Sequence, residues 1–158
     1  MNIVVREARL DEAQLIAELT RAAWQNKVAA SSSGHHESLE RVLSDLRAGG
    51  GFVLLLDHMA VGSLRWMPLE TDTEVWEILR MGIIPNYRGR GLSQHLLEAV
   101  IHHAQECAVS QLRLAVRADQ DKLIDFYAAF GFELAPEIEY SHANPAEPLP
   151  NVMRKFLL

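Results

Sequence analysis

Residues 79–97 read LRMGIIPNYRGRGLSQHLL, and this stretch decides the fold. Its first part is an apolar run that ends at Pro85, which cannot continue a β-ladder because it has no N–H group. Its last part spaces Leu92, Leu96 and Leu97 along one face of a helix. Two arginines and two glycines lie between the strand and the helix. Because a helix N-terminus presents unpaired N–H groups and a partial positive charge, the stretch predicts an anion site.

The residues before this stretch predict one strand, two helices and an antiparallel meander. Helices are indicated by apolar residues three and four positions apart, and strands by short β-branched or alternating runs. Asp11 should cap the first helix, and the turn at Asp57 and His58 should connect a hairpin. In chain order we expect a strand at 3–5, a helix at 13–23, a loop at 26–37, a helix at 38–48, and strands at 52–56, 60–66 and 74–85.

The residues after it predict a helix at 92–107, a strand at 112–116, a short helix at 123–130 and a closing strand at 151–158. A proline-containing segment at 135–150 separates the last two elements. We find no internal repeat with a period of 20 to 50 residues. The order of elements predicts an α+β domain in which helices cover a mixed sheet, with residues 1–158 as a single domain.

Composition narrows the class of protein. With 49% hydrophobic and 23% charged residues, the 158-residue chain has the usage of a packed globular domain. The formal charge of -6 argues against general binding to nucleic acid or anionic membranes, and favours cationic small molecules or basic peptides. The single cysteine, Cys107, is expected to be buried and inert. It fits a reducing cytoplasm, and no export signal or membrane-length apolar run is visible.

The glycines around Arg88 and Arg90 have a physical role in the predicted anion site. Glycine lets the backbone approach an anion without a Cβ in the way, and the two guanidinium groups could supply further donors. The alternative is an ordinary strand-to-helix turn with solvated arginines. The chain has neither the GxxxxGK[ST] pattern of a P-loop nor GxGxxG after its first strand, so any anion held here is bound in another way.

The stretch resembles the acetyl-CoA binding motif of the GNAT family of N-acetyltransferases. That motif has arginine or glutamine, two residues, glycine, one residue, and then glycine or alanine; Arg88, Gly91 and Ser93 take these three places. Residues 126–134, FYAAFGFEL, are similar to the family's segment after the fifth strand. The motifs have the family's separation and lie in the expected elements, so the resemblance covers nearly the whole chain.

The resemblance implies a fold and a cosubstrate. The implied fold is a central mixed, mostly antiparallel sheet, with splayed fourth and fifth strands, flanked by about four helices. Acetyl-CoA would place its pyrophosphate on the backbone amides of residues 88–93 and its pantetheine arm along the strand edge at 81–83. Ser93 stands where the family keeps a smaller residue, and Gln120 where it often has asparagine. The cofactor-binding residues implied are Met81, Gly82, Ile83, Arg88, Gly89, Arg90, Gly91, Leu92, Ser93, Gln120 and Phe126.

Two residues are candidates for catalysis. An amine attacks a thioester only when neutral, so a base must remove its proton, and Glu77 takes the place where many family members carry a glutamate. The alternatives for Glu77 are a partner for substrate charge or a solvated strand residue, and a bulge would change which face it occupies. Tyr127 matches the family tyrosine that protonates the departing thiolate, with a core aromatic as the alternative. A backbone N–H near Gly82 or Ile83 should polarise the thioester carbonyl.

The acceptor is expected to be an amine on a small molecule or peptide, with no nucleic-acid or membrane partner; a homodimer stays an option. Family architecture and charge suggest a wall for it built from the 26–37 loop, Trp24, Trp76, Glu137, Glu139, Tyr140 and His142, with His35 and His36 as loop candidates whose alternative is solvation. We expect no metal, because His95 and His102 or His103 lie two helical turns apart. The predicted function is direct acetyl transfer without a covalent enzyme intermediate. The rival is a non-catalytic CoA-binding regulatory module with the same fold.

Overall fold

The computed structural model describes residues 1–25 and 33–157, and within them seven strands form one sheet in the order β1-β2-β3-β4-β5-β7-β6. All neighbouring strands are antiparallel except β4 and β5, which are parallel. The sheet is therefore mixed and mostly antiparallel, as predicted. The strands are β1 (Ile3–Glu7), β2 (Gly50–Leu56), β3 (Met59–Pro68), β4 (Val75–Ile83), β5 (Gln111–Val116), β6 (Glu133–Leu134) and β7 (Asn151–Phe156).

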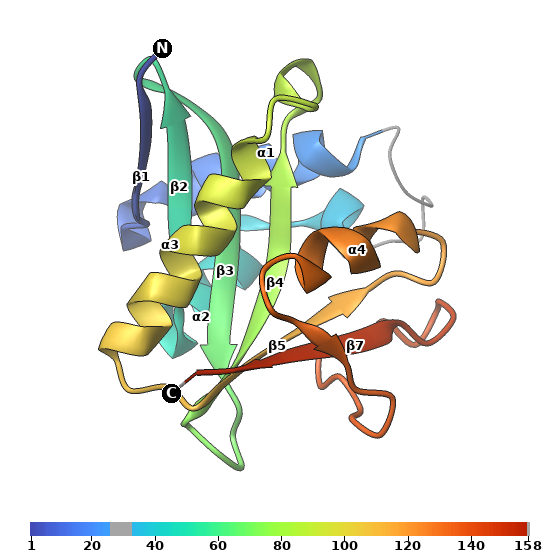
Figure 1. Cartoon of the computed structure of the whole chain (residues 1–158). Helices are drawn as coiled ribbons and strands as arrows, with labels where there is room; N and C mark the ends of the chain where they lie inside the picture. The colour runs from blue at the N-terminus through green and yellow to red at the C-terminus, as the bar shows by residue number, and fades with distance from the viewer. Residues whose placement is uncertain (26–32, 158) are drawn as a thin grey trace.

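Four α-helices in the described residues cover both faces of this sheet (Figure 1). They are α1 (Ala13–Trp24), α2 (Leu39–Ala48), α3 (Leu92–Glu106) and α4 (Lys122–Ala128). Helix α3 packs on β1 to β4 from one face, and α1 and α2 pack on β2, β3 and β4 from the other. The four helices and their order confirm the predicted fold class.

Each face of the sheet has its own apolar core. The larger core lies under α3 and α4 and includes Leu64, Leu96 and Leu112, all with essentially no exposed side chain. The smaller one joins α1 and α2 to β2 through residues such as Ile16 and Val42. Burying apolar side chains on both faces stabilises the sheet as a layer between helices.

Two expectations from the sequence need correction, and a third is tested only in part. Asp11 does not cap α1, because it lies inside a 3-10 turn, Leu10–Glu12, that precedes the helix. Cys107, expected to be buried, is exposed at the C-terminal end of α3. Of the predicted loop at 26–37, residues 26–32 lie outside the described residues, and Ser33–His36 form a 3-10 turn. No helix in the described part of the chain is long and apolar enough to cross a membrane.

Candidate functional site

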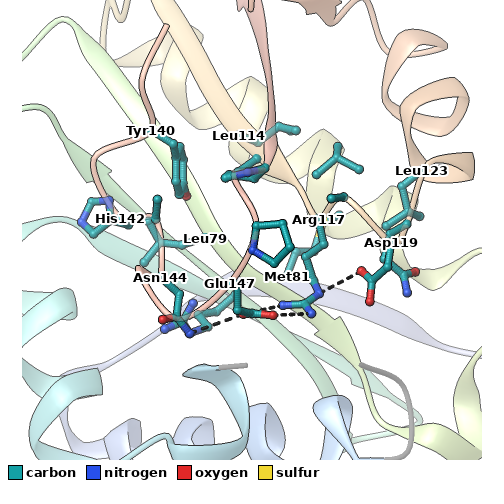
Figure 2. A pocket seen from close by; sticks show the side chains of 18 of the residues that line it. Leu79, Met81, Leu114, Arg117, Asp119, Leu123, Tyr140, His142, Asn144 and Glu147 are labelled. Carbon is teal, nitrogen blue, oxygen red and sulfur yellow. Dashed lines mark hydrogen bonds and ion pairs between the residues drawn. The ribbon is translucent and has the colours of Figure 1, made fainter. Parts of the chain in front are cut away.

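A cavity opens where β4 and β5 separate. The two strands pair at only three positions, the last joining Glu77 to Arg113, and beyond that point they diverge. This is the splay that the family resemblance implied. The cavity has a volume of about 500 Å³ and is walled by β4, by β5 and the turn after it, by α4, and by the segment before β7. Its lining includes Ile78, Leu79, Arg80, Met81, Leu114, Arg117, Asp119, Gln120, Leu123, Tyr127, Tyr140, His142, Asn144 and Glu147 (Figure 2).

A β-bulge shapes the β4 wall of this cavity. Arg80 has a φ of +57°, which side chains rarely adopt. The pairing with β3 shifts there: Ser63 opposes Gly82 while Arg65 opposes Leu79, so β4 has one extra residue. The bulge interrupts the simple alternation of side chains between the two faces of the sheet that we expected for this strand. Strained backbone of this kind concentrates at functional sites.

The loop between β4 and α3 is built around two glycines in the left-handed region. Gly89 has a φ of +76° and Gly91 a φ of +72°, and Gly91 directly precedes the first residue of α3. A Cβ added at either position would meet no atom within 4 Å. The backbone at the start of this 15-residue helix is thus open on the glycine side. Open N–H groups at a helix N-terminus suit a phosphate.

The two arginines of this loop are occupied by protein groups. Arg88 donates hydrogen bonds to the backbone carbonyls of Ile83 and Ala23, so it ties the loop to the ends of β4 and α1. Arg90 stacks over the Tyr87 ring, with its guanidinium carbon 5.0 Å from the ring centroid. These contacts leave the backbone amides, more than the arginine side chains, as the groups that an anion would meet.

Tyr127 on α4 is a buried residue of the cavity wall. Its side chain is 9% exposed and packs edge-on against the rings of Phe126 and Phe132. Burial raises the pKa of Tyr127 to about 12, since the phenolate would lose its hydration. Within the described residues the hydroxyl makes no hydrogen bond. The group is therefore a protonated donor at the cavity.

Glu77 on β4 lies behind the cavity wall. Its exposed fraction is 0%, and it is absent from the lining. The carboxylate accepts hydrogen bonds from the backbone N–H and hydroxyl of Ser141, and its Oε1 lies 2.6 Å from Nδ1 of His142. Burial raises the pKa of Glu77, but the hydrogen bonds from His142 and Ser141 outweigh it and leave the pKa below its ordinary value. Glu77 is an ionised, fully partnered carboxylate.

The segment between β6 and β7 forms the far wall and is fastened to the sheet at several points. Tyr140 donates a hydrogen bond of 2.9 Å to the carbonyl of Ile78, and burial raises its pKa. Arg117 at the end of β5 holds Glu147 through two contacts of 2.8 and 2.6 Å, as the dashed lines in Figure 2 show. Asn144 donates to the same carboxylate at 3.4 Å. These contacts position the segment against the opened edge of the sheet.

A buried charge network supports the cavity from the α2 side. Arg65, with 0% of its surface exposed, pairs with Glu37 and with Asp45, the latter at 3.0 Å. The Nε of Arg80 lies 3.2 Å from the same Glu37 carboxylate. Burial raises the pKa of Asp45, and the charge of Arg65 lowers it in part. The network anchors the bulged residue of β4 to the segment before α2.

The predicted site residues divide into those that line the cavity and those that lie outside its lining. Met81, Gln120 and Tyr127 line the cavity, as do Trp24, Tyr140 and His142 of the predicted acceptor wall. The cofactor residues Gly82, Ile83, Phe126 and 88–93 lie outside the cavity lining.

Three predictions for the acceptor wall are wrong. Trp76 stacks on Trp66 in the core under α3, with ring centroids 3.7 Å apart, because the parity of β4 turns it away from the cavity. Glu137 pairs at the surface with Arg154, and neither Glu137 nor Glu139 reaches the cavity.

Some residues of the cavity were not predicted. Four of them lie in no recognisable motif: Arg80, Arg117, Asn144 and Glu147. The ion pair between Arg117 and Glu147 joins positions 30 residues apart. Within the described residues no group of three or more His, Cys, Asp or Glu side chains could hold a metal ion.

A family model described as the acetyltransferase (GNAT) family matches residues 14–132. The chain belongs to this family. The match includes β4, the glycine loop, α3, β5 and α4, and so it covers the splay and Tyr127.

Sequences similar to this GNAT chain include two bacterial mycothiol acetyltransferases. The one from Renibacterium salmoninarum is 27% identical over 130 residues, which are 74% of this chain and 38% of the relative. The one from Propionibacterium freudenreichii is 30% identical over 142 residues, or 87% of this chain and 46% of the relative. The chain thus spans less than half the length of these relatives.

Solved structures of GNAT acetyltransferases share the fold. The PaiA N-acetyltransferase of Thermoplasma acidophilum, in complex with coenzyme A, superimposes with a TM-score of 0.78 at 16% identity over 99% of both chains. The ribosomal-protein-S18-alanine N-acetyltransferase of Escherichia coli gives 0.76 at 16% identity, over 99% of this chain and 94% of that one. At these identities the likeness concerns the fold.

The residues of this GNAT chain fit coenzyme A. The open side of Gly89 and Gly91 leaves room at the start of α3 for a pyrophosphate, which a Cβ would reduce. Beyond Glu77, the β4 edge is free of β5 and can accept an extended arm through backbone hydrogen bonds. The glycine loop follows directly after the freed part of β4 in the same strand–loop–helix unit, as one elongated cosubstrate requires.

Proposed function

We propose that this chain transfers an acetyl group from acetyl-CoA to a primary amine of a small molecule or peptide, with both substrates bound at once. The observation that carries the proposal is the combination of an opened β4 edge with a protonated Tyr127 at the same cavity. An electron-rich thiolate leaves from this edge, and a buried phenol is a suitable proton donor for it.

The residues of the chain have distinct parts in this reaction. The backbone amides of residues 88–93 hold the pyrophosphate, and the bulged β4 edge around Met81 aligns the pantetheine arm. A backbone N–H near Gly82 or Ile83 stabilises the oxyanion that develops on the thioester carbonyl. Tyr127 donates its proton to the departing sulfur and recovers one from the new amide nitrogen. Acetyl-CoA supplies the activated acetyl group.

Direct transfer is favoured over a covalent enzyme intermediate. Cys107, the single cysteine, lies at the end of α3 opposite the glycine loop. In the part of the chain that the structure describes, no cysteine lines the cavity. No thiol at the cavity is therefore available to carry the acetyl group from acetyl-CoA to the amine.

The experiment incubates the protein with acetyl-CoA and a panel of primary amines and basic peptides, and follows free thiol release. Calorimetry measures the binding of CoA to the same protein in parallel. Thiol release that depends on an amine supports the enzyme. Binding of CoA without turnover on any amine would favour the regulatory module. Absence of CoA binding would overturn both.

A further inference from the structure

Glu77 and His142 form a buried-to-exposed pair at the cavity wall. The carboxylate of Glu77 has no exposed surface, whereas the His142 side chain is 33% exposed and lines the cavity. Nδ1 of His142 lies 2.6 Å from Oε1 of Glu77. In Figure 2, His142 lies on the same side of the cavity as Tyr140 and Leu79. A proton on an amine in the cavity would meet the imidazole before it met the carboxylate.

The hydrogen bonds around Glu77 fix which imidazole nitrogen carries the proton. An ionised carboxylate can only accept, so Nδ1 of His142 must be the donor in their contact. The other ring nitrogen, Nε2, then has a free lone pair when the ring is neutral. The assignment follows from the hydrogen-bond pattern, as tautomers generally must.

We propose that His142 is the base that takes the proton from the acceptor amine, and that Glu77 is the positioning residue that holds its tautomer and orientation. This rests on the proposed acetyl transfer. The Nε2 lone pair takes one proton from the ammonium group, which leaves a neutral amine and an imidazolium. The amine nitrogen then bonds the acetyl carbon, and the carbon–sulfur bond breaks. The second amine proton replaces the one that Tyr127 gives to the sulfur, and the imidazolium releases its proton to solvent.

Neighbouring groups are less suited to this part. Glu77 itself already accepts from the Ser141 N–H, the Ser141 hydroxyl and His142, and it has no surface on the cavity. The Ser141 hydroxyl donates to Glu77, so it is not poised as a nucleophile. Tyr140 donates to the Ile78 carbonyl, and its ring lies 5.9 Å from that of His142. Among these described groups, the imidazole alone combines a fixed orientation with access to the cavity.

A kinetic experiment tests the base. With acetyl-CoA and the amine of highest turnover in the panel, His142→Ala should lower kcat/KM about 100-fold. Free imidazole at tens of millimolar should raise the kcat/KM of this variant at least tenfold. His102→Ala, at an exposed histidine on α3, should leave the rate and the imidazole response unchanged. A His142→Ala rate within threefold of the parent enzyme, or a slow variant indifferent to imidazole, would overturn the proposal.

A spectroscopic experiment tests the positioning role of Glu77 without any acceptor. In protein labelled with 15N in histidine, the His142 signals, assigned by their loss in His142→Gln, should show the Nδ1–H tautomer at neutral pH. Glu77→Gln should shift the population toward the Nε2–H form and lower kcat/KM about tenfold, with no rescue by imidazole. An unchanged His142 tautomer in Glu77→Gln would contradict the positioning role of Glu77. Because this readout needs no turnover, a failure of acetyl transfer itself stays distinguishable from a failure of the dyad.

Discussion

Tyr127 shows, at the scale of one residue, how burial holds a titratable group in one protonation state. Its pKa of about 12 means that the phenol stays protonated throughout the range in which an enzyme assay is run. We expect Tyr127→Phe to lower kcat about 100-fold, because general acid catalysis of leaving-group departure contributes on this order. Calorimetry should find CoA affinity within threefold of the parent, since only the hydroxyl is lost. Unchanged thiol release would contradict the assigned proton donor.

Glu12 is a residue whose charge should matter for folding stability. Hydrogen bonds from Arg6, against the opposing effect of burial, and a further one from the Arg9 backbone lower its pKa to about 2. A depressed pKa stabilises the fold at a pH above the unfolded value of about 4.3, and this stability is lost as the pH falls toward 2. Because Arg6 is 34% exposed, solvent screens the ion pair, and we reduce the stabilisation expected from the full pKa shift to about 2 kcal/mol.

Glu12→Gln should therefore lose about 2 kcal/mol of unfolding free energy at pH 7, and less than half of that at pH 3. Urea denaturation at the two pH values measures the difference. Glu18→Gln, on the exposed side of α1, is the matched control and should change little. An equal loss at both pH values would show that the packing of Glu12 matters more than its charge.

At the scale of the element, α3 depends on the residue that precedes it. Gly91 at φ +72° starts the helix in a conformation that alanine adopts at a cost of about 1 kcal/mol. We expect Gly91→Ala to lower the unfolding free energy by about this amount and to weaken CoA binding about tenfold, because its Cβ enters the space beside the helix N-terminus. Gly91→Asn separates the effects, since asparagine tolerates the conformation but keeps a Cβ. Calorimetry should find weak CoA binding by both variants; full affinity in Gly91→Asn would contradict the steric argument.

Most elements could be predicted from the sequence because their signals are local. Apolar spacing identified the helix that became α3, and Pro85 marked the end of β4 two residues after its last residue. The cap of α1 was misassigned to Asp11 because the Glu12 side chain accepts a hydrogen bond from the Arg9 backbone and stabilises a 3-10 turn before the helix. The bulge at Arg80 left no trace in the pattern of β4, since its ion-pair partner Glu37, which also pairs with Arg65, is distant in the chain.

At the scale of the whole molecule, the sheet consists of two parts joined by three residue pairs between β4 and β5. The segment before β7 bridges them, with Glu147 bound to Arg117 and Tyr140 bound to β4. We expect Glu147→Ala to speed hydrogen exchange in residues 141–150 and to raise the KM for the amine about tenfold, because the far wall loses its fastening. Mass spectrometry of exchange, with Glu106→Ala as a control at an exposed pair, measures this. Unchanged exchange would mean that Tyr140 and Ser141 suffice.

The site was predictable where its chemistry is local and not where it spans the fold. The glycine loop and Tyr127 lie in short motifs that can be read along the chain. The contact between Glu77 and His142 joins positions 65 residues apart, and the segment that brings them together has prolines and no periodicity. Only the three-dimensional path of that segment reveals that the carboxylate faces an imidazole.

The stacked pair of Trp66 and Trp76 gives the molecule an optical property. With ring centroids 3.7 Å apart and planes within 9°, the two indoles share their excited states, so their circular dichroism should report the pairing of β3 with β4. Trp24, the remaining tryptophan, lies in the cavity wall on the other face of the sheet. Its emission should respond to whatever fills the cavity. The chain therefore carries two light-absorbing labels of its own, one for the integrity of the sheet and one for occupancy of the site.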